Sequence, residues 1–129
     1  MSQDSQLAFV RRLVDKIVMD WKGTSPKRMF GSDAWFAQAN IFSLLDPGTR
    51  QVGVKLTEPA QYARARTLRG ASDFKPGGDD TKPMRAWVML PPTLCLDEES
   101  LEPYLREAYD AAMSLPAKLQ KNRGRAWLE

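Results

Sequence analysis

The sequence predicts a two-layer α+β domain, in which an antiparallel sheet of about four to five strands packs against an N-terminal, a middle and a C-terminal helix. Apolar residues recur at three- and four-residue steps over residues 5–21 and 97–113, as they do on the buried face of a helix. They alternate with other residues over 51–56, which is the spacing of a half-buried strand. The elements lack the regular strand–helix alternation of a doubly wound nucleotide-binding sheet.

Length and composition indicate one folded domain followed by a tail. The chain has 129 residues, of which 43% are apolar and 27% charged, values typical of globular domains. We expect residues 1–116 to form a single domain and residues 117–129 to be a flexible basic tail. The tail contains four basic residues and one acid, Glu129, so its charge of +3 equals the net charge of the whole chain. These residues are Lys118, Lys121, Arg123 and Arg125.

Local signals bound the first helix at both ends. Asp4 or Ser5 can cap its start through a side-chain oxygen, and Gly23 follows its last apolar turn. Residues 22–26 are therefore predicted as a loop. The next segment, 27–45, contains aromatic and short apolar clusters, which favour short strands over a helix.

A hairpin is the best-marked β pairing. The sequence Asp46-Pro47-Gly48 has turn chemistry, because proline fixes φ and glycine tolerates positive φ. The sequence therefore predicts that residues 41–45 pair with 51–56 in an antiparallel hairpin.

The predicted middle helix lies between Thr57, a candidate cap, and Gly70. Pro59 falls in its first turn, where the missing N–H is harmless. Residues 71–83 are predicted as a loop, and residues 84–90 as a strand.

Both faces of the strand at 84–90 are mostly apolar. One face carries Met84, Ala86, Val88 and Leu90, and the other carries Arg85, Trp87 and Met89. This pattern predicts a central strand, with Trp87 and Met89 covered by the first or last helix, or an exposed apolar surface that awaits a partner.

The final helix, 97–113, contains a proline. If the helix starts near Ser100, Pro103 falls in its first turn and removes no hydrogen bond. Otherwise residues 97–99 form a separate short turn. Pro116 is expected to end the helix.

The residue types present exclude several kinds of site. The chain has no histidine and one cysteine, so it cannot form a zinc finger, an internal disulfide or a Ser-His or Cys-His nucleophile pair. Cys95 lies between two leucines and is interpreted as a buried small hydrophobe. We expect no catalytic residue, no cofactor and no metal site. No signal peptide or membrane span is recognised, so a cytoplasmic protein without membrane contact is predicted.

Several short motifs occur in an order that resembles the TfoX N-terminal-domain family. They are Arg28-Met29-Phe30-Gly31, residues 54–58 (VKLTE), residues 71–77 (ASDFKPG), residues 87–91 (WVMLP) and Ala111-Ala112 at the end of the last helix. The resemblance covers residues 27–113, although Ser32 stands where the family commonly has a second glycine.

This resemblance implies a bacterial α+β domain related in shape to the YjbR-like group. Members occur alone or joined to a C-terminal domain with helix-hairpin-helix character, and the family is named for regulators of natural competence. It implies a fold and supplies no set of catalytic residues.

Two surfaces are candidates for function. Trp, Met and Arg suit the centres of protein interfaces, so one candidate interaction surface consists of Arg28, Arg85, Trp87 and Met89. Basic residues on the middle helix, joined by the basic tail, are candidate phosphate contacts: Arg64, Arg66 and Arg69 with Lys118, Lys121, Arg123 and Arg125. The expected function is a non-enzymatic regulatory or protein-interaction domain, with an unknown protein partner or a homodimer. The alternative is weak, sequence-independent nucleic-acid binding.

Overall fold

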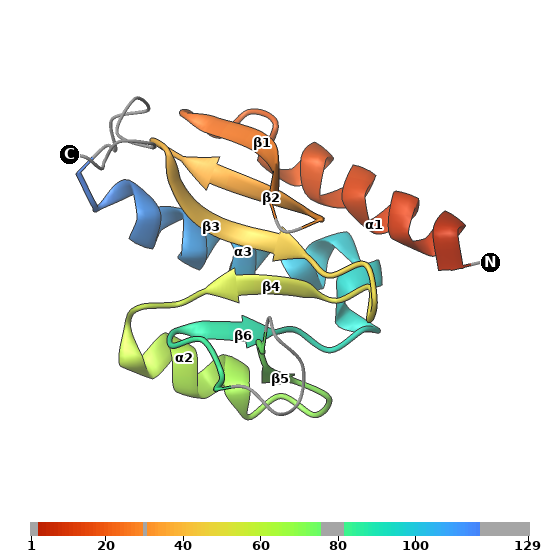
Figure 1. Cartoon of the computed structure of the whole chain (residues 1–129). Coiled ribbons are helices and arrows are strands. Elements are labelled where there is room, and N and C mark those ends of the chain that lie inside the picture. Colours follow the sequence, from red (N-terminus) through yellow and green to blue (C-terminus); the bar gives the residue numbers. More distant parts are fainter. Residues whose placement is uncertain (1–2, 30, 76–81, 117–129) are drawn as a thin grey trace.

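The computed structural model describes residues 3–29, 31–75 and 82–116, and within them it is an α+β domain (Figure 1). The elements along the chain are α1 (Gln3–Val18), β1 (Thr24–Met29), β2 (Ser32–Ala37), β3 (Asn40–Leu45), β4 (Val52–Lys55), α2 (Pro59–Arg66), β5 (Ser72–Asp73), β6 (Trp87–Met89), a short 3-10 helix (Leu94–Leu96) and α3 (Glu98–Met113). The predicted fold class is confirmed. The predicted tail, 117–129, lies outside the described residues.

The sheet has six strands in the order β1-β2-β3-β4-β6-β5, one more than the largest number expected. Every pair of neighbouring strands is antiparallel. The predicted hairpin is confirmed, because Leu45 lies opposite Val52 and Ser43 opposite Val54. After β4 the chain passes through α2 and β5 before β6 returns to the sheet beside β4.

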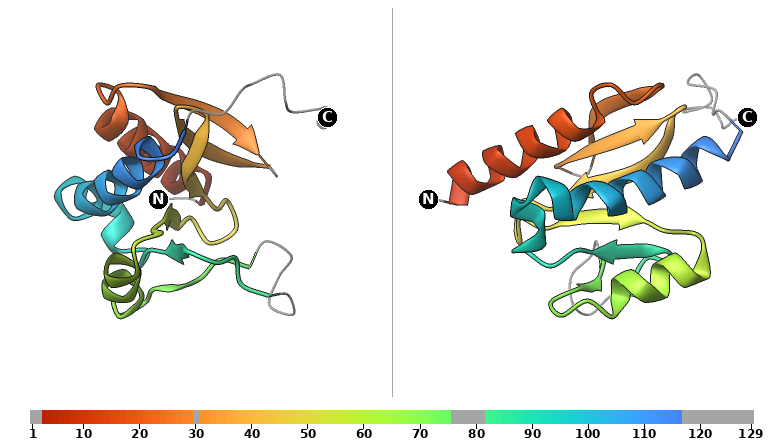
Figure 2. Two further views of the ribbon diagram at one scale, coloured as in Figure 1. Left: turned by 90° about the vertical axis from the view of Figure 1, so that its left-hand side faces the viewer. Right: turned by 180° about the vertical axis from the view of Figure 1, so that it is seen from behind.

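The main core lies between the sheet and the helices. Figure 2 shows α1, α2 and α3 on the same side of the sheet. Buried apolar side chains of α1 and α3, such as Val14 and Leu105, pack in one cluster with Val54 of β4 and Val88 of β6. Ala65, the buried residue of α2, belongs to the same cluster, while α1 and α3 use the periodic apolar faces that the sequence predicts.

A second, smaller cluster lies on the opposite face of the sheet. It consists of Ala34, Leu44, Trp87 and Met89, with Phe36, Ile41 and Phe74 packed against it. The expectation that the first or last helix covers Trp87 and Met89 is therefore wrong. Side chains alternate along a strand, so Val88 faces the helices while its two neighbours face away. Phe74, just after β5, covers them instead, with its ring 5.9 Å from that of Trp87.

Glu58, and not the predicted Thr57, caps α2, and three strands also differ from the structure predicted for their segments. β6 is shorter than the predicted strand at 84–90, because Ala86 has φ +74° and the chain turns there. β5 lies within the predicted loop at 71–83, and β1 begins inside the predicted loop at 22–26. These two strands lie at the two edges of the sheet, where strand formation depends on contacts with the adjacent strand more than on the local sequence.

Neither expectation for Pro103 describes α3. The helix begins at Glu98, directly after Asp97, whose side chain accepts a hydrogen bond from the Ser100 amide at 3.0 Å. It then continues through Pro103 without a break, so the proline lies in the helix interior. Because proline has no N–H, the Glu99 carbonyl loses its usual partner four residues along the helix.

Within the described residues, no helix is both long and apolar enough to cross a lipid bilayer.

Candidate functional site

The face of the sheet opposite the helices is the candidate site. We call it the open face and define it by Ala34, Leu44, Lys55, Trp87 and Met89, together with the loop residues Phe74 and Met84. The strand pairing brings these residues together, because Leu44 and Met89 both lie opposite Gly53 and Trp87 lies opposite Lys55.

Gly53 allows the side chains on either side of β4 to meet. A Cβ atom at this position would lie 2.8 Å from the Sδ of Met89 and 3.4 Å from a methyl carbon of Leu44. The missing side chain therefore leaves room for both neighbours to cover the strand.

An apolar pocket of about 120 Å³ opens on this face. Trp87 and Ala34 lie deep in it at 2% and 1% exposure, whereas Met29 and Met84 are 37% and 44% exposed. Leu44, Ile41 and Phe74 form further walls, and Lys55 and Ser32 are its polar lining residues. A pocket of this size matches one leucine or phenylalanine side chain, since a buried apolar cavity of about 150 Å³ can hold benzene.

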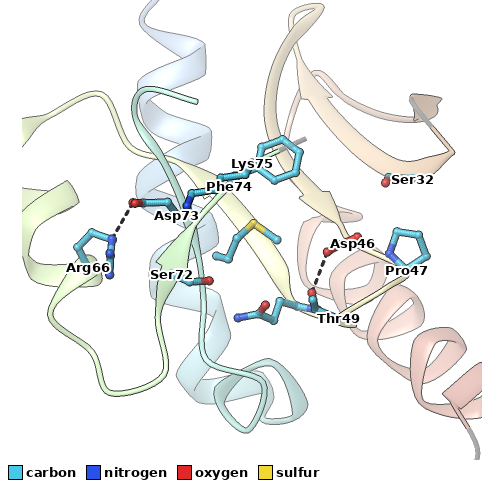
Figure 3. Close-up of a pocket in the computed structure, with 11 residues that line it drawn as sticks. Ser32, Asp46, Pro47, Thr49, Arg66, Ser72, Asp73, Phe74 and Lys75 are labelled. Carbon is cyan, nitrogen blue, oxygen red and sulfur yellow. Dashed lines mark hydrogen bonds and ion pairs between the residues drawn. The ribbon is translucent and has the colours of Figure 1, made fainter. Parts of the chain in front are cut away.

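A larger, more polar pocket of about 520 Å³ adjoins the apolar one, and Ser32 and Phe74 line both. Figure 3 shows its polar side chains. Asp46 accepts a hydrogen bond of 2.9 Å from the Thr49 hydroxyl. Asp73 forms an ion pair of 2.9 Å with Arg66. Together the two pockets form a depression with an apolar part and a polar part.

Met84 was missed as a site residue because strand alternation places it on the face opposite Trp87. The turn at Ala86 reverses this assignment, so that both side chains line the apolar pocket. The Met84 amide donates a hydrogen bond of 2.7 Å to the Phe74 carbonyl, which fixes these two walls relative to each other. A positive φ at alanine has no signal in the sequence.

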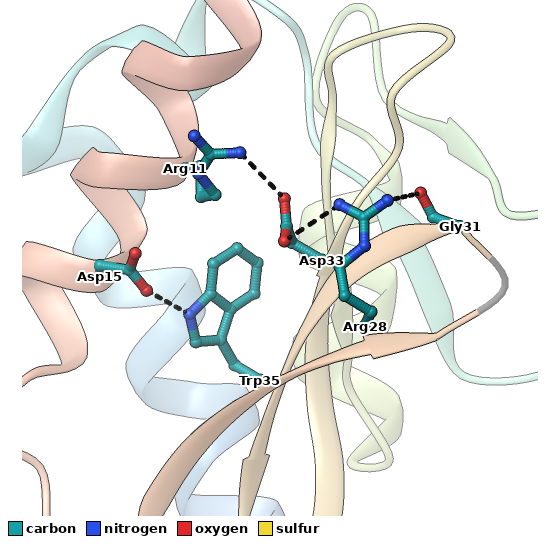
Figure 4. A network of polar contacts seen from close by, with 6 residues as sticks. All are labelled: Arg11, Asp15, Arg28, Gly31, Asp33 and Trp35. Atoms are coloured by element: carbon teal, nitrogen blue, oxygen red, sulfur yellow. Dashed lines mark hydrogen bonds and ion pairs between the residues drawn. The ribbon is translucent and has the colours of Figure 1, made fainter.

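Of the four predicted interaction residues, Trp87 and Met89 are the only two that belong to the open face as defined here, and both are buried in this conformation. Arg28 instead secures the turn between β1 and β2 (Figure 4). It forms an ion pair of 3.5 Å with Asp33 and donates a hydrogen bond of 3.0 Å to the Gly31 carbonyl. Arg85 is exposed at the turn before β6.

The same network connects α1 to the sheet. Arg11 of α1 lies 3.7 Å from the Asp33 carboxylate, and the Trp35 indole N–H donates to Asp15 of α1 at 2.8 Å (Figure 4). These contacts fix the position of β2. On the opposite face of this strand, Ala34 lines the apolar pocket.

The arginines of the middle helix make contacts within the domain. Arg64 forms an ion pair with Glu107 of α3, and Arg66 forms one with Asp73 and also donates to the Ala71 carbonyl at 3.3 Å. Arg69 is exposed and has no ion-pair partner among the described residues. Two of the three predicted phosphate contacts are thus partly neutralised, and the four tail residues lie outside the described part of the chain.

Cys95 is fully buried in the main core, as the sequence predicts. Its Sγ accepts a hydrogen bond from the Val52 amide at 3.2 Å and donates one to the Leu90 carbonyl oxygen at 3.7 Å. Burial raises the pKa of the thiol to about 11, although the Val52 amide opposes this shift. A neutral, enclosed thiol is a poor nucleophile.

The raised pKa of Cys95 predicts a loss of stability in alkaline solution. The folded chain holds the thiol proton more tightly than the unfolded chain, so this contribution is complete below pH 9.0 and is lost as the pH rises toward about 11. Denaturant unfolding of the wild type and of Cys95→Ala at several pH values measures it. Above pH 9.0 the free energy of unfolding of the wild type should fall relative to that of Cys95→Ala. A difference that does not change with pH would contradict the buried thiol.

No group of three or more potential metal ligands of the types His, Cys, Asp and Glu occurs among the residues that the structure describes. Comparison of the chain with protein-family models, curated proteins and solved structures finds no match.

Proposed function

We propose that the protein is a non-enzymatic interaction domain of the cytoplasm, similar to the TfoX N-terminal domain, that binds a protein partner through its open face. One observation carries this proposal: an apolar pocket, with the half-exposed Met29 and Met84 at its mouth, opens on a sheet face that no described helix covers. Methionine and aromatic side chains around a concave apolar site are typical of protein-binding surfaces.

The edge of the sheet is less suited to binding a partner than its face. β1 is an edge strand, but Pro26 has no N–H to offer, and Lys27 and Arg28 place charge along the strand. Proline and charged residues on an edge strand hinder the addition of another strand. The partner is therefore proposed to contact side chains of the open face.

The non-enzymatic part of the proposal is supported by the residue types. The chain contains no histidine, and its one thiol is enclosed in the core. The acidic residues Glu98 and Glu99 lie in the first turn of α3, where negative charge is favoured by the helix dipole.

Two matched substitutions test the use of the open face. Met84→Glu places a charge at the pocket mouth, and Met19→Glu places the same charge in the turn directly after α1, where Met19 is 69% exposed. Each tagged protein is used to recover partners from a lysate of the native cell, after thermal unfolding has shown that all three proteins are folded. We expect the wild type and Met19→Glu to recover the same partner and Met84→Glu to lose it. Recovery of the same proteins by all three, or of none, would contradict the proposal.

A second copy of the chain is one form that the partner can take. Sedimentation velocity over a range of protein concentrations distinguishes such a dimer from a monomer. A dimer of the wild type that Met84→Glu converts to a monomer would identify the open face as the dimer interface.

Nucleic-acid binding is the alternative, and the ion pairs of Arg64 and Arg66 reduce its electrostatic basis. We expect no micromolar binding of labelled duplex DNA at near-physiological salt, measured by fluorescence anisotropy. Steeply salt-dependent binding that disappears in Arg69→Gln, or when the four basic residues of the tail are replaced by glutamine, would favour the alternative instead.

A further inference from the structure

The acidic side chains around the open face already have partners. Asp33 contacts both Arg11 and Arg28, and Asp73 contacts Arg66. Asp46 accepts hydrogen bonds from the Thr49 hydroxyl and from the Gly48 amide. The arginines compensate the charges of Asp33 and Asp73, whereas the hydrogen bonds to Asp46 come from neutral groups and leave its negative charge in the polar pocket.

The lysines in the two pockets differ from Asp33 and Asp73, because they form no ion pair within the part of the chain that the structure describes. Lys55 lines the apolar pocket and Lys75 lines the polar one, and neither has an acidic partner among the described residues. The strand pairing sets Lys55 opposite Trp87, so its aliphatic stem lies along the apolar wall while its ammonium group can remain in water. The apolar pocket thus has Lys55 and no acidic residue in its described lining, while the polar pocket contains Lys75 together with Asp46.

This combination specifies the partner, provided that the open face is the binding face proposed above. We infer that the open face binds an acidic peptide segment of a partner protein, whose one leucine- or phenylalanine-sized side chain enters the apolar pocket while neighbouring carboxylates approach Lys55 and Lys75. The pocket volume of about 120 Å³ limits the anchor to one such side chain. A basic segment would bring like charges together at Lys55, since the described lining of the apolar pocket has no acidic residue.

Methionine methyl groups provide reporters for this site without any substitution in the protein. Met29 and Met84 lie at the pocket, whereas Met113 packs against the core between sheet and helices, and the exposed Met19 follows α1 and does not line the pocket. The protein is labelled with ¹³C-methyl methionine and titrated with an end-blocked pentapeptide of sequence Asp-Glu-Leu-Glu-Asp. Two matched peptides replace leucine by alanine or all four acids by lysine.

We expect the acidic leucine peptide to shift the methyl signals of Met29 and Met84 and to leave those of Met19 and Met113 unchanged. Replacing leucine by alanine should weaken binding about tenfold or more, because the anchor no longer fills the pocket. The lysine-rich peptide should bind more weakly than the acidic one. Lys55→Gln should weaken binding of the acidic peptide about threefold, which is the effect expected from the loss of a partly exposed ion pair. It should not weaken binding of the lysine-rich peptide.

Equal binding of the acidic and lysine-rich peptides would overturn the inference. So would shifts of Met29 and Met84 with phenylacetate but with none of the peptides, since the site would then take a small carboxylate. If no peptide shifts these signals while Met84→Glu still loses its partner from the lysate, the inference fails and the proposed function stands. If Met84→Glu recovers its partner unchanged, the proposed function fails and the inference fails with it.

Discussion

Replacing Trp35 with alanine is expected to lower the free energy of unfolding by about 3–5 kcal/mol, the usual cost of removing a large aromatic side chain from a core. The indole is 1% exposed within the cluster that joins the sheet to the helices. Its N–H also donates to Asp15 of α1 at 2.8 Å, so the substitution removes both packing and a helix–sheet hydrogen bond. Equilibrium unfolding in urea, extrapolated linearly to water, measures the change.

Trp35→Phe separates the two contributions. It keeps most of the buried ring but cannot donate to Asp15, which is exposed and can bind water instead. We expect a smaller loss of about 1–2 kcal/mol. A loss below about 1 kcal/mol for Trp35→Ala would contradict the position of this residue in the core.

Replacing Pro103 with alanine is expected to stabilise the protein by about 1–3 kcal/mol, because an interior proline costs about 3 kcal/mol relative to alanine in a helix. The proline lies six residues into α3, and its side chain is exposed, so the substitution removes little packing. Alanine restores an N–H that can donate to the Glu99 carbonyl. The same urea titration reports the gain.

Glu102→Ala is the matched control for Pro103→Ala. Glu102 is its exposed neighbour on the same helix, and its substitution should change stability by no more than about 0.5 kcal/mol. An unchanged or lowered stability of Pro103→Ala would show that the proline is accommodated without cost.

Much of the fold could be predicted from local patterns. The apolar periodicity of α1 and α3 and the turn chemistry at residues 46–48 depend only on residues close in sequence. β5 and the first three residues of β1 were missed, because each edge strand acquires its structure by pairing with a neighbour. Local patterns carry little information about such pairing.

The candidate site was harder to predict than the fold. The sequence places Trp87 and Met89 in a candidate interaction surface, but the turn at Ala86 that adds Met84 to their side of the sheet has no sequence signal. The ion pairs of charged side chains are also hard to predict from the sequence. Arg64 looks solvated along the chain, yet it meets Glu107, which is 43 residues away in sequence. Which charges remain uncompensated becomes visible only when distant segments are brought together.

Photo-crosslinking at the pocket mouth tests the open face most directly. A photoreactive benzoylphenylalanine is introduced at position 84 in one protein and at position 19 in another, and both are irradiated in the native cell. If the open face binds a partner, position 84 forms a covalent adduct with a protein partner or with a second copy of the chain, and position 19 forms none. Adducts of equal yield from both positions, or adducts from position 19 alone, would contradict a binding site on this face.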